Sequence, residues 1–388
     1  MAEVKGHCDD AFTKVRDLLA SNIASEAELG ACVCVNIDGK NVVDIWAGHT
    51  DENRQTEWQE KTIINVFSCS KTITNLAVLI CHDRGLLDVN DKISKHWPEF
   101  AANGKQDILV RNILSHSTGV AGWEQPITVQ DVCDVEKSTA LLAKQAPWWE
   151  PGTASGYHAL NQGHLAGELV RRVTGKSLKQ FIAEDIAGPL GADFQLGAVE
   201  KDWSRISTLV PPPALTAETG AAGLSADSVS MKALTGPTPD ALFALTPEWR
   251  NAEIGAANGH GNARSVNRIM STVSRGGEVD GTRLLSQKTI DLIFQEQTNG
   301  TDLVLLKPLR FGIGYGLPLK ESVPWIPDRR VCFWGGWGGS SIIMDLDKKM
   351  TISYVMNKMG AGTVGNPRTV GYIEAIYDCV NKMSNGTA

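Results

Sequence analysis

The pattern of apolar and polar residues near the N-terminus predicts a helix and then a pair of strands. Between Asp10 and Ser21 the apolar residues recur at helical spacing, at Ala11, Val15, Leu18 and Leu19. The run ACVCVNIDGKNVVDIWAG follows, and Asp38-Gly39 in its middle is a dipeptide that favours a tight hairpin turn. This part of the chain therefore predicts an amphipathic helix followed by a β-hairpin.

Helical periodicity returns after Ser68. The segment SKTITNLAVLICHDRG places apolar residues on one helical face and ends at Gly85, so it predicts a buried helix. Pro- and Gly-rich joints such as APWWEPGTASG and AGPLGA then divide the middle of the chain into helical segments. Near the C-terminus, RRVCFWGGWGGSSIIMDLDKKMTISYVMNK predicts three strands with a turn at 345–349, and a helix over about 370–381 ends the chain.

Strands at both ends of the chain thus enclose a helical middle. This order predicts an α/β (α+β) fold in which both ends build one antiparallel sheet flanked by helices, with a mostly helical subdomain inserted. We expect a single domain over residues 1–388, with an α/β part at about 1–104 and 259–388 and a helical part at about 105–258. Two sequential domains are the alternative, but no linker in the sequence supports them.

Composition and charge narrow the possible functions. Apolar residues make up 42% and charged residues 21% of the chain, as in ordinary globular proteins. The net charge of −7 argues against nucleic-acid binding, which requires a basic surface. No apolar run reaches the roughly 20 residues of a membrane span, and the first residues do not form a secretory signal. We therefore expect a cytoplasmic protein with no membrane partner.

The eight cysteines show neither metal-type spacing nor an evident disulfide framework. Cys32 and Cys34 are two apart in a predicted strand, where they are poorly placed to bridge each other. Free thiols in a reducing compartment are the expected state. We expect no metal and no cofactor.

The stretch FSCSK contains the only Ser-x-x-Lys sequence in the chain, formed by Ser68 and Lys71. If Ser68 opens a helix, the two side chains lie on one face, one turn apart. A lysine ammonium there would favour a serine alkoxide, whereas a neutral lysine could accept the serine proton. The alternative is that Ser68 is simply the N-cap of the helix.

Two further segments carry candidate chemistry. EPGTASGYHALNQG places Tyr157 after a Pro-Gly turn, although core packing would also explain a tyrosine there. FWGGWGGSS places four glycines beside Trp334 and Trp337. Glycine weakens a strand interior, so something should approach this backbone closely; a β-bulge is the alternative to a ligand.

In their order and spacing these segments resemble the serine β-lactamase and penicillin-binding protein family. Within it the chain is most similar to the class C type and to the family VIII carboxylesterases. The resemblance extends over nearly the whole chain through GLLDVNDKISKHWPEF, ILSHSTGVAGW and NGHGNARSVNRIMSTVSRGGEVDGTRLLS. It implies a β-lactamase/transpeptidase-like fold.

The resemblance also implies roles for individual residues. Ser68 would be the acylated nucleophile, Lys71 its activator and Tyr157 a proton shuttle, provided that the charge of Lys71 lowers the tyrosine pKa from about 10. The backbone N–H groups of Ser68 and Trp337 would form the oxyanion hole. Substrate contacts are expected from Trp334, Gly335 and Gly336 and from Trp123, for which core packing is the alternative. His116 is expected to support its loop.

The chain departs from the β-lactamase pattern at two positions. Ala159 stands where β-lactamases carry an asparagine that holds the substrate amide, and Trp334 replaces the lysine of the Lys-Thr-Gly strand. Both departures remove polar anchors, so a small-molecule ester or other acyl donor is the expected substrate. Acyl transfer to a small acceptor and β-lactam hydrolysis are alternatives within the same chemistry. A non-catalytic scaffold is the alternative from another class.

Overall fold

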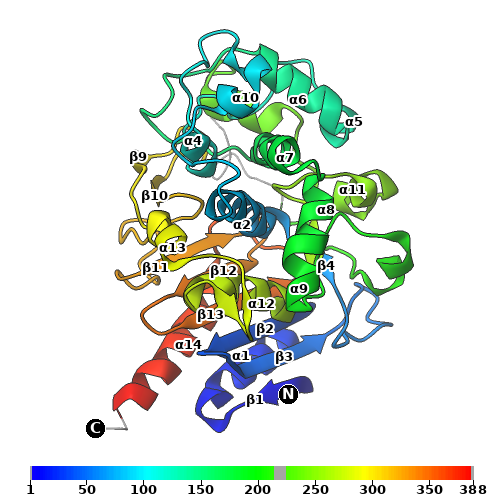
Figure 1. Cartoon of the computed structure of the whole chain (residues 1–388). Coiled ribbons are helices and arrows are strands. Elements are labelled where there is room, and N and C mark those ends of the chain that lie inside the picture. The colour runs from blue at the N-terminus through cyan, green and yellow to red at the C-terminus, as the bar shows by residue number, and fades with distance from the viewer. Residues whose placement is uncertain (1, 214–223, 386–388) are drawn as a thin grey trace.

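The computed structural model describes residues 2–213 and 224–385 and is built around a six-stranded sheet (Figure 1). The strand order is β1-β3-β2-β13-β12-β11, and all neighbours are antiparallel. The strands are β1 (Val4–Cys8), β2 (Gly30–Ile37), β3 (Lys40–Gly48), β11 (Val331–Gly335), β12 (Ser341–Asp345) and β13 (Met350–Met356). Since β2 pairs with β13, the two ends of the chain meet in one sheet, which confirms the predicted fold class. The boundaries of the helical part stay a prediction.

The hairpin between β2 and β3 forms where the sequence predicts it. Asp38 and Gly39 both have positive φ, 46° and 96°, as the preferred two-residue hairpin turn requires. At the other end of the chain, β12 and β13 also form the predicted pair. The connection from β11 to β12 runs through 336–340, the glycine-rich segment.

Three helices pack against the sheet. The helices α1 (Thr13–Ala24) and α14 (Pro367–Asn385) contact each other and the strands β3 and β13, and α12 (Ala263–Ser274) contacts β2, β12 and β13. The first helix begins three residues later than expected, because a 3₁₀ turn at Asp10–Phe12 precedes it. The last helix is longer at both ends than the predicted segment.

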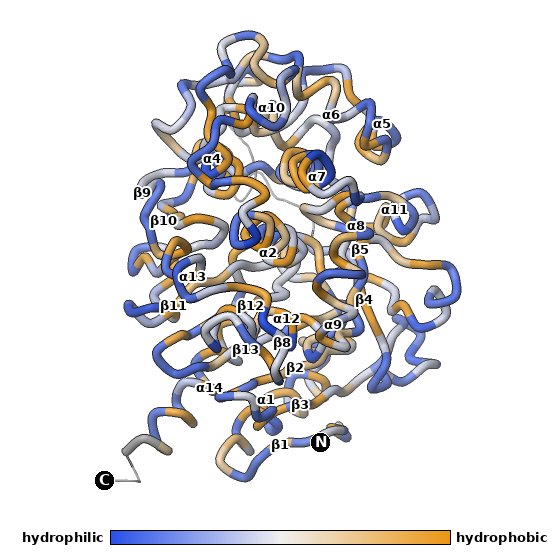
Figure 2. Tube along the Cα trace, viewed as in Figure 1, coloured by the Kyte–Doolittle hydropathy of each residue, from blue (hydrophilic) through white to orange (hydrophobic). Residues whose placement is uncertain are grey.

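Helix α2 (Ser70–Asp83) lies near the centre of the molecule (Figure 1). Every residue from Ser70 to Cys81 is buried, and α2 contacts α7 (Asn161–Thr174), α12 and α13 (Gln287–Ile293). Figure 2 shows hydrophobic residues along α2 and α12, between the sheet and the helices above them. Gly85 has a φ of 71° just after the helix, in the conformation of a helix stop, as predicted.

Short elements complete the fold. Among the described residues between 105 and 258, the α-helices are α4 (Val110–Leu114), α5 (Val129–Cys133), α6 (Val135–Lys144), α7, α8 (Leu178–Phe181), α9 (Gly188–Leu190), α10 (Val229–Thr235) and α11 (Pro247–Asn251), joined by turns and loops. Helix α3 (Ile93–His96) precedes them. The small sheets contain β4 (Ile64–Asn65), β5 (Gln195–Leu196), β6 (Gly259–Gly261), β7 (Glu278–Val279), β8 (Thr282–Arg283), β9 (Thr298–Thr301) and β10 (Pro308–Phe311).

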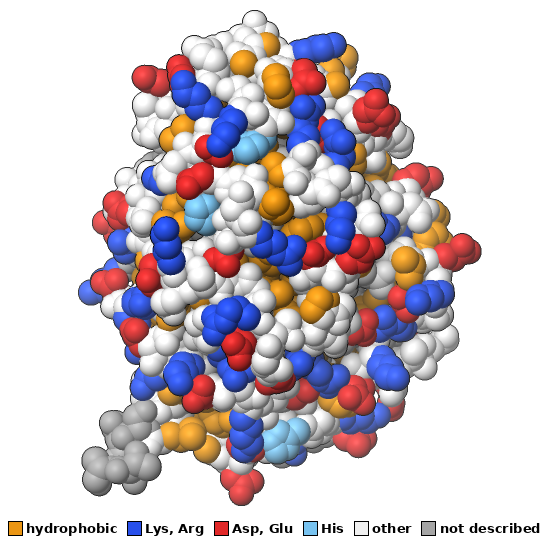
Figure 3. Space-filling view, in the orientation of Figure 1, with side chains coloured by type: hydrophobic (Ala, Val, Ile, Leu, Met, Phe, Trp, Pro, Cys, Tyr) orange, Lys and Arg blue, Asp and Glu red, His pale blue; other side chains and the backbone are white. Residues whose placement is uncertain are grey.

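The surface is mixed in charge. Figure 3 shows Lys and Arg side chains interspersed with Asp and Glu over the face in view.

In the part of the chain that the structure describes, no helix is both long enough and apolar enough to cross a membrane. All eight cysteines lie in that part and are free thiols. The cytoplasmic location stays a prediction.

Candidate active site

Ser68 lies on a strained turn directly before α2. The turn, Phe67–Cys69, is a single 3₁₀ turn, and Phe67 has a φ of 46°. A left-handed conformation at a bulky residue costs of order 1–3 kcal/mol and persists only where the surrounding structure holds it. Here the backbone N–H of Val66 donates to the carbonyl of Gly259 (2.9 Å), which fixes the entry into the turn.

The expectation that Ser68 opens the helix is corrected in detail. Helix α2 begins at Ser70, and no side chain caps its N-terminus. Ser70 holds the turn instead, because its hydroxyl donates to the carbonyl of Phe67 (2.6 Å) and accepts from the N–H of Gly259 (2.8 Å). The Ser68 hydroxyl has no capping role and faces the amine of Lys71, 3.2 Å away.

Lys71 is buried and has three hydrogen-bond partners. Besides Ser68 Oγ, its Nζ donates to the carbonyl oxygens of Ala159 (2.8 Å) and Ala256 (3.0 Å). No carboxylate is among these partners. Burial holds the pKa of Lys71 well below its usual value, which favours the uncharged amine. A neutral amine has two N–H groups for the two carbonyls and one lone pair, which the Ser68 hydroxyl can approach.

Tyr157 reaches the same point from the segment before α7. Its hydroxyl interacts with Ser68 and accepts a hydrogen bond from Nε1 of Trp334 (3.1 Å). Lys71 Nζ lies 4.7 Å from the centre of the phenol ring. Burial raises the pKa of Tyr157, and its interactions with Ser68 and Trp334 offset only part of this effect.

These electrostatics correct one sequence-based expectation. Tyr157 was expected to be a base if the charge of Lys71 lowered its pKa. Burial instead disfavours the charged form of both groups, raising the pKa of Tyr157 and lowering that of Lys71. Burial therefore favours a neutral amine and a protonated phenol, one on each side of Ser68.

The glycine-rich segment packs closely against the Ser68 turn. A Cβ on Gly336 would lie 2.5 Å from the carbonyl oxygen of Val66, and a Cβ on Gly335 would lie 2.8 Å from that of Thr363. The groups that approach this backbone are thus other backbone segments of the chain. The Trp337 ring contacts Phe67 edge-on at 5.5 Å. Within the described ranges, the backbone N–H of Trp337 has no protein acceptor, as an oxyanion-hole donor requires.

An aromatic cluster surrounds Tyr157. The rings of His116 (4.8 Å) and Trp334 (5.3 Å) contact Tyr157, and Phe311 contacts both of them. His116 supports its loop as expected, since its Nδ1 accepts the N–H of His158 (3.1 Å). Its contact with the tyrosine was not predicted, because the sequence places the two residues far apart.

Trp123, expected to line the site, is buried in the protein core. Its side chain is 1% exposed, its indole N–H donates to the carbonyl of Ser138 (3.2 Å), and its ring packs edge-on against His164 at 5.0 Å. These contacts belong to the core of the helical part. The alternative of core packing therefore describes Trp123.

Comparisons with known proteins identify the family. A family model described as Beta-lactamase matches residues 15–373. The chain belongs to the beta-lactamase family. It is 33% identical over 330 residues to Esterase/beta-lactamase LipL of Mycobacterium tuberculosis (strain ATCC 25618 / H37Rv), covering 83% of this chain and 76% of LipL.

Solved structures show the same relationship. A family VIII carboxylesterase is 37% identical with a TM-score of 0.90, covering 97% of this chain and 100% of the other. A penicillin-binding protein homologue from Caulobacter crescentus is 34% identical with a TM-score of 0.88, at the same coverage. The predicted resemblance to this family is confirmed.

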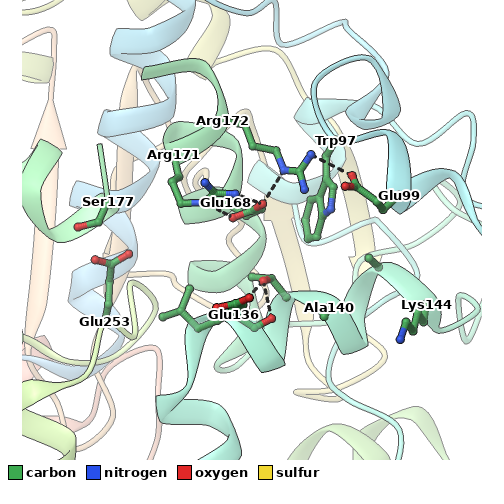
Figure 4. A pocket seen from close by; sticks show the side chains of 13 residues that line it. Trp97, Glu99, Glu136, Ala140, Lys144, Glu168, Arg171, Arg172, Ser177 and Glu253 are labelled. Carbon is green, nitrogen blue, oxygen red and sulfur yellow. Dashed lines mark hydrogen bonds and ion pairs between the residues drawn. The ribbon is translucent and has the colours of Figure 1, made fainter. Parts of the chain in front are cut away.

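A separate hollow lies away from Ser68 (Figure 4). It has a volume of about 710 Å³ and is lined by residues of α6 and α7 and by Trp97 and Glu253. The nearly buried carboxylate of Glu168 lies in its wall, and both carboxylate oxygens accept hydrogen bonds from Arg171 or Arg172. Since these charges satisfy one another, the hollow does not compete with the Ser68 site as the catalytic centre.

Proposed function

We propose that this protein hydrolyses carboxylic esters through an acyl-enzyme on Ser68. The observation that carries the proposal is the position of Ser68 Oγ between the amine of Lys71 (3.2 Å) and the hydroxyl of Tyr157. A serine hydroxyl is a weak nucleophile until a neighbouring base takes its proton. Membership of the beta-lactamase family and the esterases among its relatives support a serine ester hydrolase.

Acylation begins with the neutral amine. As Ser68 Oγ bonds to the ester carbonyl carbon, its proton passes to Lys71 Nζ, and the new oxyanion accepts from the backbone N–H groups of Ser68 and Trp337. The carbonyls of Ala159 and Ala256 keep the lysine lone pair directed at Ser68 before the transfer and stabilise the ammonium afterwards. Collapse of the intermediate breaks the bond to the alcohol, which takes the Tyr157 proton.

Deacylation reverses these roles. Water attacks the acyl carbon and gives a proton to the Tyr157 phenolate, while the Lys71 ammonium returns its proton to Ser68 Oγ as the acid departs. Both groups end as they began, and no proton needs to pass directly between them. Between the two steps the ammonium and phenolate form a close ion pair, and the N–H of Trp334 donates to the phenolate.

Trp334 and its neighbours favour an ester over a β-lactam. Trp334 is 3% exposed and packs against Tyr157 and Phe311, so its position offers the substrate no cation. A β-lactam carries a carboxylate, and removing it from water without a partner is costly. A small-molecule ester without a carboxylate avoids this cost.

A labelling experiment tests the proposal. A fluorophosphonate probe should give one adduct on the peptide that contains Ser68, and Ser68→Ala should lose the adduct and at least ~10³-fold in kcat on short-chain aryl esters. An adduct on Cys69 or Ser70 would refute the assignment. An unlabelled wild-type protein would instead support the non-catalytic scaffold.

Product analysis separates the remaining alternatives. With an aryl ester, a chromogenic cephalosporin and added alcohols or amines as acceptors, we expect free acid from the ester and little cephalosporin turnover. Comparable rates on the two substrates would favour a β-lactamase. Acylated acceptor as the main product would favour an acyltransferase.

A further inference from the structure

A buried carboxylate lies directly behind the catalytic tyrosine. Asp302 is fully buried in the loop between β9 and β10, and its Oδ1 accepts three backbone N–H groups. The donors are Val304 (2.9 Å) and Leu305 (2.9 Å) in the same loop and Tyr157, 145 residues away in the chain (3.0 Å). Among residues 2–213 and 224–385, its other oxygen, Oδ2, has no hydrogen-bond partner.

This arrangement is costly for stability alone. A buried carboxylate with one unpaired oxygen loses more hydration than its hydrogen bonds return, so a neutral side chain would close the loop more cheaply. Oδ1 of an asparagine could accept the same N–H groups. Besides the two hydrogen bonds within its own loop, the Asp302 side chain makes a hydrogen bond to the backbone N–H of Tyr157.

The backbone around Tyr157 is held from two sides. On one side, the 302–307 loop contributes Asp302 and also the N–H of Leu303, which donates to the carbonyl of Ser155 (2.9 Å). On the other side, His116 accepts the N–H of Gly156 through its carbonyl (2.9 Å) and that of His158 through Nδ1 (3.1 Å). Three consecutive N–H groups, those of residues 156–158, are thus fixed by side chains or backbone of two distant segments.

We infer that Asp302 is a positioning residue that fixes the backbone of Tyr157 so that its hydroxyl meets Ser68 and the leaving alcohol. This inference rests on the proposed role of Tyr157 as the proton donor to that alcohol. A displacement of about 1 Å in a reacting group can cost about 10²-fold in rate, so a hydrogen bond that sets the tyrosine backbone is enough to affect turnover.

The test compares two esters with the same acyl group, one with an alkyl alcohol and one with p-nitrophenol. An alkoxide needs the tyrosine proton to leave, whereas p-nitrophenolate does not. Asp302→Ala should therefore lower kcat/KM for the alkyl ester by about 10²-fold and for the p-nitrophenyl ester by less than about 5-fold. Asp302→Asn, which keeps the Oδ1 acceptor, should restore the ratio of the two esters to within about 3-fold of wild type.

Ser230→Ala is the matched control. The buried Ser230 hydroxyl donates to the carbonyl of Val304 (2.8 Å), so this variant loses a hydrogen bond to the same loop and leaves Asp302 with its three partners. Any loss in Ser230→Ala should be equal for the two esters. Equal losses in Asp302→Ala, or a failure of Asp302→Asn to restore the ratio, would overturn the inference.

Two further measurements keep the outcome decisive. In a Tyr157→Phe background, Asp302→Ala should add no more than about 2-fold, because Asp302 acts through the tyrosine hydroxyl. If circular dichroism shows that Asp302→Ala is unfolded, Asp302→Ser is measured with the same two esters instead. Its hydroxyl is an acceptor on a shorter side chain. Fluorophosphonate labelling of wild-type Ser68 separates the hypotheses: no labelling refutes the proposed function, whereas normal labelling with equal ester losses refutes only the role of Asp302.

Discussion

Replacing Trp334 with phenylalanine should slow the enzyme by removing one hydrogen bond. Trp334 Nε1 donates to the Tyr157 hydroxyl oxygen at 3.1 Å inside a buried cluster, where both side chains are at most 3% exposed. Phenylalanine keeps an aromatic ring against Tyr157 and Phe311 and loses the N–H donor. The variant therefore tests whether negative charge develops on the tyrosine oxygen.

The size of the effect depends on that charge. A buried hydrogen bond between neutral groups contributes about 0.5–1.5 kcal/mol, and one to a charged group about 1.5–3 kcal/mol. If Tyr157 gives up its proton to an alkyl alcohol, the bond strengthens by about 1–1.5 kcal/mol in the transition state, so Trp334→Phe should lower kcat/KM for alkyl esters by about 5- to 15-fold. If the phenol stays neutral, the hydrogen bond is equally strong in the free enzyme and in the transition state, so kcat/KM should change by less than about 2-fold.

Trp123 provides a matched control for the assay. Its indole N–H also donates inside the protein, to the carbonyl of Ser138 at 3.2 Å, but none of its contacts described above reaches Ser68. Trp123→Phe and Trp334→Phe should show similar losses of unfolding free energy in urea, of about 1 kcal/mol. Only Trp334→Phe should reduce kcat/KM, and it should do so more strongly for alkyl than for p-nitrophenyl esters.

The reasoning fails if the two tryptophan variants lose activity equally, since the effect would then follow from stability. It also fails if Trp334→Phe keeps wild-type kcat/KM on alkyl esters while remaining folded. In that case the hydrogen bond would exist without contributing to the transition state, and the phenolate in the proposed cycle would be wrong.

Two other predictions concern the base and the oxyanion hole. Lys71→Met should lose about 10²–10⁴-fold in kcat/KM. In the wild type, kcat/KM should fall as the pH is lowered through the Lys71 pKa, because protonation removes the base. Burial lowers that pKa, so this acidic limb of the pH–rate profile should lie well below the usual lysine range. If Lys71→Met shows the same acidic limb, Lys71 is not its origin. Gly336→Ala should lower kcat/KM by about 10²-fold, because a Cβ 2.5 Å from the Val66 carbonyl pushes the Trp337 N–H away from Ser68. Gly371→Ala, where the new Cβ meets only Leu18 at 3.7 Å, is its control, and equal kinetics in the two variants would contradict the packing argument.

The fold could be predicted because hydrophobic periodicity and turn residues act locally. Asp38-Gly39 specifies its hairpin from two residues, and the buried face of α2 is evident from its spacing. The start of α2 was placed too early because serine is one of the residue types that commonly cap a helix N-terminus. Nothing in FSCSK indicates that Phe67 adopts a left-handed conformation. The turn is held by residues far away in the chain, because the preceding residue, Val66, packs against Gly259 and Gly336.

The sequence predicts those residues of the site whose side chains would take part in the reaction, but not those that act through their backbone or through a single hydrogen bond. Ser68, Lys71 and Tyr157 stand out by their order, and the structure brings them together. The acceptors that orient Lys71 are backbone carbonyls, which any residue supplies, so no pattern marks Ala159 or Ala256. Asp302 was missed for a related reason: a single aspartate in a loop has no spacing signal, and only the folded chain shows what it contacts.

In the proposed mechanism, the same local geometry decides which of three adjacent nucleophilic side chains attacks the substrate. Ser68, Cys69 and Ser70 are consecutive, and a thiolate would be intrinsically the most reactive. Cys69 is 1% exposed and burial raises its pKa, so it stays a thiol. The Ser70 hydroxyl donates its hydrogen bond to the Phe67 carbonyl, which is not a base that can take its proton. Of the three groups, Ser68 alone faces the amine of Lys71, so in the proposed mechanism its selection as nucleophile follows from the turn that points its hydroxyl there.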